Sequence, residues 1–413
     1  MIRFIHTADL HLGTENYGKI DAKTGIHTRL LDFSHALNFC IDTAINENVD
    51  FFLFCGDAYK TTTPSPTQQK ILLNALLRLH HAQIPVVIIV GNHDNPVSFG
   101  KVNSLDLFRD LPLSGFHVIS QPQSIRIDTQ KGPVQLVGIP WPTRHSLALS
   151  NKHSFSTAHQ ISAYISKAVS MIIEHEASTL DATLPAILAG HLTVSTGMFS
   201  GSEKHAIYGN DPLFLPSQLA REPFDYVALG HLHRHQNLNL NRQPPIVYAG
   251  SIERIDFGEK EEKGFCLVTI HEKGNTDYTF IKGPMRPFIQ LEVHLNPTND
   301  HTEQLLHELE KHSIEDAIIK IIYYPPSGKK DTVNIRAIQN ACSKCAHLVG
   351  IIPIRTHLPR ETRMAMKIDM DLATLLDAYF ESKPILKDKK QKLVEQALLL
   401  YEESKAPDRE VNG

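Results

Sequence analysis

The strongest constraint on the fold of this chain is a series of five short polar motifs. Each motif directly follows an apolar run of strand length. An ordered series of this kind requires a sheet system whose strand ends meet. Asp, Asn and His supply carboxylate, amide and imidazole groups, and this is the ligand set of hydrolytic two-metal sites. The motifs are Asp9-Leu10-His11, Gly56-Asp57, Gly91-Asn92-His93-Asp94, Gly190-His191 and Gly230-His231-Leu232-His233.

The segments between the motifs indicate an α/β fold. Residues 51–54 and 85–90 are uninterrupted apolar runs, which is typical of strands buried on both faces. Between them, residues 68–80 carry apolar side chains at helical spacing. Residues 246–251 and 265–270 follow as strands without long helices between them, so part of the sheet system is predicted to be antiparallel or mixed.

A change of pattern near residue 284 predicts a domain boundary. The chain has 413 residues, enough for two or three separate cores. We assign residues 1–283 to the motif-bearing domain and residues 284–356 to a small α/β domain. The order in the second domain is β-α-β-α-β, with helices expected near 302–313 and 333–347.

The C-terminal part predicts two amphipathic helices within residues 371–403, after a linker at 357–370. The first helix has apolar residues at i, i+3, i+4, i+7 and i+8. Such faces beyond a linker favour an external partner, and the alternative is packing on the chain's own core. A polar tail is expected at 404–413.

Composition places the chain among ordinary cytoplasmic proteins. Hydrophobic residues make up 42% and charged residues 21%, and no apolar run reaches the roughly 20 residues of a membrane span. The chain is therefore expected to have no membrane partner. Five Cys without a paired framework fit a reducing compartment. Cys342 and Cys345, in a helical-looking stretch, supply only half of a tetrahedral zinc site.

The motif residues can be divided between two metal ions. Asp57 is the natural bridge, because a carboxylate has two oxygens. Asp9, His11 and one imidazole of the last motif would complete one ion. Asn92, His191 and the other imidazole would complete the second.

His93 follows the expected ligand Asn92 and falls beside the site without joining it. An imidazole there is placed to protonate a leaving oxygen or to stabilise charge on the phosphorus centre. We expect Asp94 to orient this imidazole.

The motif series over roughly residues 1–260 resembles that of the calcineurin-like metallophosphoesterases. Further stretches at 6–13, 191–203 and 248–254 resemble the SbcD-type nuclease subunits of DNA double-strand-break repair complexes. The resemblance implies two mixed β-sheets flanked by helices, and a capping domain that contacts DNA. It also implies C-terminal helices that dock on the coiled coil of an SbcC-type ATPase.

The same resemblance implies a homodimer with Mn²⁺-dependent 3′→5′ exonuclease and endonuclease activity on DNA, although Mg²⁺ or another divalent ion is an alternative. His93 is implied to assist cleavage. Some relatives carry a second histidine where this chain has Lys60, and this bears on the balance of exonuclease and endonuclease activity. The implied ligands are Asp9, His11, Asp57 and His233 for one Mn²⁺, and Asp57, Asn92, His191 and His231 for the other.

Two other functions are consistent with the sequence. One is a different phosphoesterase, such as a protein phosphatase or a small-molecule or cyclic-nucleotide phosphodiesterase. The Asp-Arg-Gly of Ser/Thr phosphatases is absent after Asp57. The other is a non-catalytic scaffold for the ATPase. Loss of His93 or of a metal ligand would indicate such a scaffold, and the chain retains all of these residues. The net charge of −4 neither supports nor excludes DNA binding, because local Lys and Arg can contact phosphates.

Overall fold

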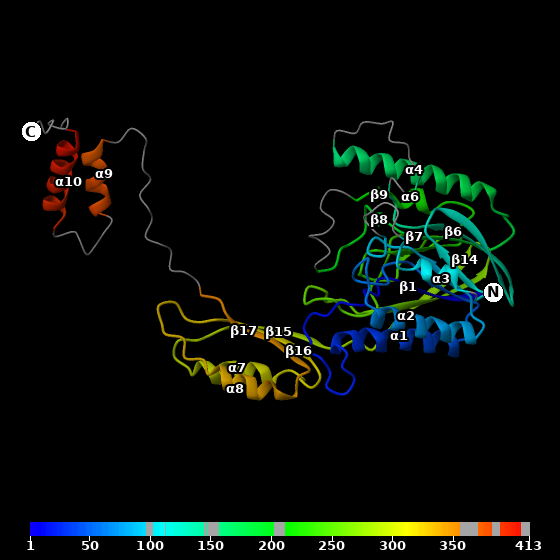
Figure 1. Ribbon diagram of the computed structural model, residues 1–413, viewed down its shortest axis with the longest axis horizontal. Helices are drawn as coiled ribbons and strands as arrows, with labels where there is room; N and C mark the ends of the chain where they lie inside the picture. The colour runs from blue at the N-terminus through cyan, green and yellow to red at the C-terminus, as the bar shows by residue number, and fades with distance from the viewer. Residues whose placement is uncertain are drawn as a thin grey trace, which may run out of the picture.

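Two six-stranded mixed sheets lie face to face, with helices on both outer faces, in the computed structural model of this chain (Figure 1). The structure describes residues 1–95, 102–111, 113–143, 147, 157–201, 211–355, 371–381 and 389–405. A small α/β unit and a pair of C-terminal helices follow the sandwich. The predicted fold class is therefore confirmed.

The first sheet has the strand order β14-β13-β1-β2-β3-β4. Its four strands from β1 to β4 are parallel, and β13 and β14 add an antiparallel hairpin at one side. This confirms the mixed sheet that was predicted because residues 246–270 have no long helix between their strands. The strands are β1 (Ile2–Thr7), β2 (Phe51–Phe54), β3 (Val86–Ile89), β4 (Phe116–Ile119), β13 (Gly264–Glu272) and β14 (Asn275–Lys282).

The second sheet has the order β11-β12-β10-β7-β6-β5, with its four central strands parallel and both outer strands antiparallel. Two short strands form a separate pair, β8 (Thr193–Val194) with β9 (Leu213–Phe214). The sheet consists of β5 (Gln123–Thr129), β6 (Gly132–Ile139), β7 (Ala186–His191), β10 (Tyr226–Gly230), β11 (Gln236–Asn237) and β12 (Ile246–Tyr248).

Helices cover the outer face of each sheet. The predicted helix at 68–80 is α2 (Pro66–His81), which begins with a capping box between Ser65 and Gln68. Its apolar stripe packs on the first sheet in the same core as α1. The others are α1 (Thr28–Asn46) and α3 (Asp106–Asp110) beside the first sheet, and α4 (Ala158–Thr179) and α6 (Pro216–Leu219) beside the second.

A buried polar link crosses the core between the sheets. Phe4 stacks on Phe51 with ring centroids 4.5 Å apart, and Tyr226 of the other sheet meets Phe4 edge-on. Next to them, fully buried His6 places Nδ1 3.1 Å from the Tyr226 hydroxyl and Nε2 3.2 Å from the Leu229 carbonyl. A carbonyl only accepts, so His6 Nε2 carries the proton and the Tyr226 hydroxyl donates to Nδ1.

The small α/β unit has three parallel strands in the order β15-β16-β17 and a core of its own. The prediction of a helix up to residue 347 was wrong. The helix ends at Ala341, because the Ala317 carbonyl accepts from the N–H groups of Ala346 and His347 and starts the last strand there. The elements are β15 (Phe288–His294), α7 (His301–Glu310), β16 (Ile318–Tyr324), α8 (Ile335–Ala341), η1 (Cys342–Lys344) and β17 (His347–Pro353).

The C-terminal helices are α9 (Leu372–Glu381) and α10 (Lys390–Lys405), and they pack against each other. Lys390 joins them through ion pairs of 2.9 Å to Asp377 and 2.6 Å to Glu381. The second helix continues two residues beyond the predicted end at 403. The expected linker at 357–370 and the tail beyond 405 lie outside the described residues. Among the described helices, none has the length and apolar character needed to cross a membrane.

The His6 link predicts a specific dependence of stability on pH. Burial lowers the pKa of His6 to about 3, so the unfolded chain binds a proton that the folded chain does not. The stabilisation is complete above pH ~6.5 and is lost as the pH falls towards ~3. We expect His6→Gln to flatten the pH dependence of the unfolding free energy between pH ~7.5 and ~5. Urea unfolding with EDTA present measures it, and equal slopes for both proteins would contradict the assignment.

Candidate metal centre

The carboxyl ends of five parallel strands, three from the first sheet and two from the second, meet at one edge of the sandwich. The pairing of β7 with β10 sets His191 directly beside Gly230, one residue before His231. The loops after β1, β2 and β3 reach the same edge from the other sheet. All nine predicted site residues lie here: Asp9, His11, Asp57, Asn92, His93, Asp94, His191, His231 and His233.

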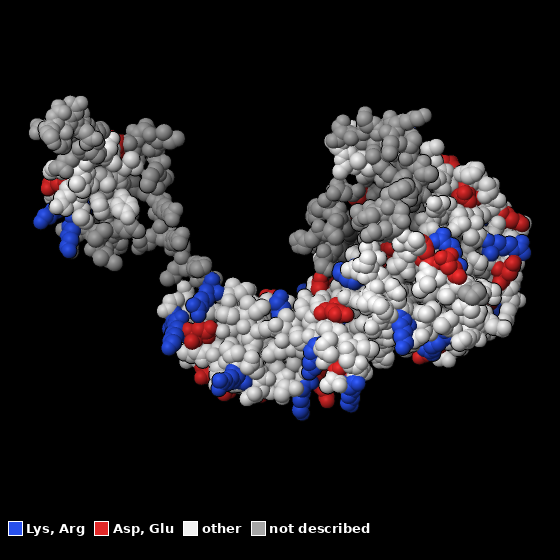
Figure 2. Space-filling model, viewed as in Figure 1, with Lys and Arg blue, Asp and Glu red and all other residues white. Residues whose placement is uncertain are grey.

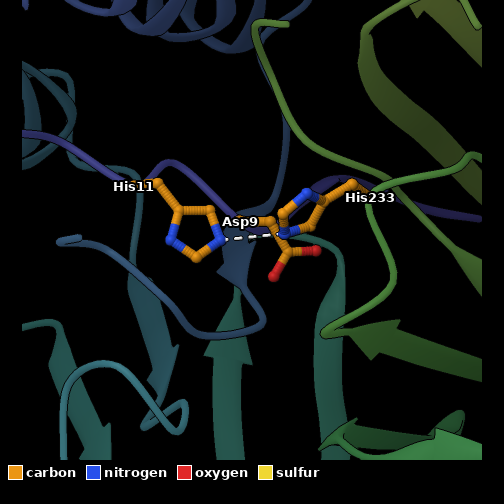
Figure 3. Close-up of side chains that lie close together, drawn as sticks. All are labelled: Asp9, His11 and His233. Atoms are coloured by element: carbon orange, nitrogen blue, oxygen red, sulfur yellow. Dashed lines mark hydrogen bonds between the residues drawn. The ribbon is translucent and has the colours of Figure 1, made fainter. Parts of the chain in front are cut away.

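The first group of candidate ligands is Asp9, His11 and His233 (Figure 3). One ligand atom from each lies within 4.8 Å of the others. The Nε2 atoms of His11 and His233 are only 3.0 Å apart. Two imidazole nitrogens that face one point beside a carboxylate are the arrangement expected around a shared cation.

The second group contains Asn92, His191 and His231. The side-chain oxygen of Asn92 is 2.9 Å from His191 Nε2 and 3.1 Å from His231 Nδ1. The amide oxygen and two imidazole nitrogens therefore converge as those of the first group do. The two groups are distinct in their residues, and this is what a two-metal site requires.

Asp57 lies between the two groups. Its Oδ2 is 3.6 Å from His11 Nε2, and its Oδ1 is 3.5 Å from His191 Nε2. The two carboxylate oxygens thus face different groups, as a bridging ligand must.

The charges of the site also fit divalent cations. Asp9 and Asp57 are 0% and 2% exposed, and among the described residues neither has a Lys or Arg partner. Isolated buried carboxylates are costly unless positive charge compensates them. The oxygen and nitrogen donors together make this cluster a candidate dinuclear metal site.

Four candidate ligands have a backbone conformation that L-residues rarely adopt. The φ angles are +52° at Asp9, +45° at His11, +59° at Asp57 and +103° at His231. Hydrogen bonds to the neighbouring loop stabilise this conformation. The Asp9 N–H, for example, donates to the Gly56 carbonyl over 3.0 Å. Strain of this kind concentrates at functional sites.

Asp94 does not orient His93, and that expectation was wrong. Its Oδ2 accepts from the N–H groups of Asp57 at 2.8 Å and Gly91 at 3.0 Å, and its Oδ1 accepts from Ala58 at 3.0 Å. The carboxylate therefore ties the loop after β2 to the loop after β3. A Cβ on Gly91 would lie 2.2 Å from Asp57 Oδ1, so only glycine permits this approach.

His93 is oriented by a backbone carbonyl instead. Its Nδ1 lies 2.9 Å from the oxygen of Lys60, so the proton is on Nδ1 and Nε2 is turned towards the site, 4.0 Å from Asp57 Oδ2. The side chain is 34% exposed, whereas that of His11 is 1% exposed. His93 is thus the imidazole at the solvent side of a buried cluster.

Two acidic residues that sequence reasoning missed contact the candidate ligands. Glu259 Oε1 is 2.8 Å from His233 Nδ1, and its Oε2 is 3.0 Å from buried Lys263. Asp211 Oδ2 is 3.2 Å from His231 Nε2. Neither acid lies in a motif or at a strand end, so no local spacing distinguishes them.

Burial and charge shift the pKa values of the cluster strongly. Burial alone would raise the pKa of Asp57, but the surrounding imidazoles, that of His191 above all, hold it well below its usual range. Burial opposes protonation of His191, and the charge of Asp57 outweighs it and raises this pKa to about 9. Burial raises the pKa of Asp9 to about 7. Without metal, protons therefore occupy part of the ligand set.

Metal binding should consequently release protons and strengthen with rising pH. Below pH ~7 a protonated Asp9 competes with the cation, and up to pH ~9 a protonated His191 does so. We expect the Mn²⁺ affinity to increase from pH ~6 to ~9. Calorimetric titration in buffers of different ionisation enthalpy counts the protons released. An affinity that is independent of pH, with no protons released, would contradict this picture.

The chain is similar in sequence to known proteins. The chain is 28% identical over 296 residues to the SbcD chain of the nuclease SbcCD of Staphylococcus epidermidis, covering 71% of this chain and 72% of that protein, which supports the predicted resemblance to SbcD-type nucleases. Among solved structures, a dimetal phosphatase from Danio rerio aligns with a TM-score of 0.35 at 10% identity, over 68% of this chain and 98% of that one. The protein TT1561 of Thermus thermophilus aligns with a TM-score of 0.36 at 11% identity, over the same shares. The calcineurin-like phosphoesterase family profile matches residues 2–235, and the chain therefore belongs to that family of metal-dependent phosphoesterases.

Proposed function

We propose that this chain is the nuclease subunit of an SbcCD-type complex, a Mn²⁺-dependent exonuclease and endonuclease that hydrolyses DNA phosphodiesters. One observation carries the proposal: His93 stands at the solvent side of a buried Asp and His cluster, with its Nε2 turned towards that cluster. This is the position in which an imidazole meets a substrate that enters from outside. The similarity to the staphylococcal nuclease chain supports DNA as the substrate.

In this proposal Asp9, His11, Asp57 and His233 would hold one Mn²⁺ ion. Asp57, Asn92, His191 and His231 would hold the other. When bound, such a pair of ions supplies positive charge to the phosphate oxygens and lowers the pKa of water. The two oxygens of Asp57, one near His11 and the other near His191, support this assignment of ligands to the two ions.

The protein's own residues set the proton chemistry. With Nδ1–H held by the Lys60 carbonyl, Nε2 of His93 is the atom free to carry a proton to the leaving oxygen. Asp94 keeps the loops of Asp57 and His93 at a fixed separation through its bonds to backbone N–H groups. Its role in this proposal is therefore to position the site.

The domain boundaries and partners belong to the same proposal. Residues 1–283 form the nuclease domain, and residues 284–356 form a capping domain that contacts DNA. On the face seen in Figure 2, Lys and Arg are interspersed with Asp and Glu.

We propose that the C-terminal helices dock on an SbcC-type ATPase. No described residue of α9 is buried, and Leu399, Leu400 and Tyr401 of α10 are 62%, 65% and 42% exposed. Exposed apolar side chains on such a helix pair suit the groove or coiled coil of a partner.

We also propose a homodimer formed through the region of α2 and α3. Val102, which precedes α3, and Leu107, within α3, are 73% and 48% exposed, and large exposed apolar side chains are typical of such an interface.

His93→Ala should lose DNA cleavage while metal binding is retained. Removing the proton donor should lower the cleavage rate by at least ~100-fold, because general acid catalysis contributes about that much. None of the proposed metal ligands is changed, so the Mn²⁺ stoichiometry should equal that of wild type. Labelled linear and hairpin DNA with Mn²⁺ measures cleavage, and equilibrium dialysis measures the metal.

The matched control is His271→Ala. His271 is 42% exposed and also has one ring nitrogen in a hydrogen bond, with Nε2 2.8 Å from Asp277 Oδ2, but it lies on β13 outside the cluster and outside the proposed dimer interface. It should cleave DNA like wild type.

An aryl phosphodiester tested in parallel separates the alternatives. Turnover of this small ester without DNA cleavage would reject the nuclease in favour of a small-molecule phosphodiesterase.

A further inference from the structure

A histidine binds a metal through a ring nitrogen that carries no proton, so the partner of its other nitrogen decides whether it can serve as a ligand. The buried imidazoles of this site have different partners on the nitrogen that does not face the site. His191 Nδ1 donates to the Cys55 carbonyl over 2.7 Å, which leaves Nε2 for the site. His231 is reversed, with Nε2 against Asp211 and Nδ1 towards Asn92.

His233 depends on a buried carboxylate. We propose that Glu259 is a positioning residue that keeps the proton of His233 on Nδ1 and the lone pair on Nε2, turned towards Asp9 and His11. This inference rests on the proposed function, in which these three residues hold one of the two ions. The contact is short, at 2.8 Å, and the Glu259 side chain is fully buried.

The other oxygen of Glu259 is occupied by two donors. Its Oε2 already accepts from the Ile255 N–H at 2.8 Å and from Lys263 Nζ at 3.0 Å. Lys263 is itself fully buried and also donates to the His233 carbonyl over 3.0 Å. Three donors therefore lock the carboxylate, two on one oxygen and the imidazole N–H on the other.

A carboxamide cannot reproduce this pattern. In Glu259→Gln the single amide oxygen is drawn to the place where Ile255 and Lys263 both donate. The NH₂ group then faces His233 Nδ1, and two donors cannot share one hydrogen bond. The ring must move its proton to Nε2, the atom 3.0 Å from His11 Nε2. His233 would thereby stop being a ligand, although the ring stays in place.

The second ion should be spared. The imidazoles of its proposed ligands His191 and His231 are held by Cys55, Asn92 and Asp211, and a substitution at position 259 changes none of these partners. Glu259→Gln is therefore expected to weaken one of two Mn²⁺ sites by about 10–100-fold, the range typical for the loss of such a partner.

Two measurements on the full-length protein test the proposal. Long-range ¹H–¹⁵N correlation spectra of the metal-free protein report which nitrogen of His233 is protonated, and equilibrium dialysis with Mn²⁺ counts the sites. We expect Nδ1–H and two sites in wild type, and Nε2–H and one tight site in Glu259→Gln. The control is Glu262→Gln, three residues along, where the carboxylate is 53% exposed and pairs with Lys282 at the surface. It should match wild type in both measurements.

A purely structural role is tested by the double variant Glu259→Met with Lys263→Met, which removes both charges and leaves no acceptor at position 259 for the His233 Nδ1–H group. If Glu259 served only to neutralise Lys263, removing both charges would restore the stability and both metal sites, and the proposal would be overturned. If it positions His233, the double variant regains stability but keeps a single tight site. Nδ1–H in Glu259→Gln would also overturn it. Absence of Mn²⁺ binding in wild type would count against the proposed function, while the proton position would still decide the role of Glu259.

Discussion

The close packing of two sheets determines where every candidate ligand lies. At the ligand edge the sheets approach so closely that a Cβ on Gly230 would lie 2.0 Å from the Cys55 carbonyl oxygen of the other sheet. Behind this contact, the Phe4, Phe51 and Tyr226 rings and the His6 link fill the interior. If the sheets were farther apart, the groups around Asp57 would separate. The site is thus a consequence of the sandwich and does not depend on long loops.

A second constraint is electrostatic. Asp9 and Asp57 are buried with imidazoles and backbone N–H groups as partners, and protons partly compensate them in the metal-free protein. A well-folded apoprotein is compatible with this, because His191 can take up the charge that a cation would supply. The arrangement has a cost in backbone conformation, since four candidate ligands have positive φ. The loops at this edge are therefore organised for binding at some expense of stability.

The sequence was sufficient to predict the strands that precede the motifs and the meeting of nine residues at one edge, and the family resemblance implied the two sheets with their flanking helices. Strand ends and ligand types are local features, and parallel strands bring their carboxyl ends together. The partners of these residues could not be predicted. Glu259 reaches His233 through a loop after β12, and Asp94 has bonds to backbone N–H groups that no side-chain pattern reveals. The end of α8 was missed for a similar reason, since pairing with β16 overrides helical spacing after Ala341.

At position 60 the backbone and the side chain have separate roles. The main-chain oxygen of residue 60 fixes the proton of His93, and every amino acid has such an oxygen. The exposed Lys60 side chain takes no part in that bond. A change of the side chain at position 60 therefore leaves the carbonyl that orients His93 in place. In the proposed nuclease, this position would allow the contacts with the substrate to change independently of the proton on His93 Nδ1.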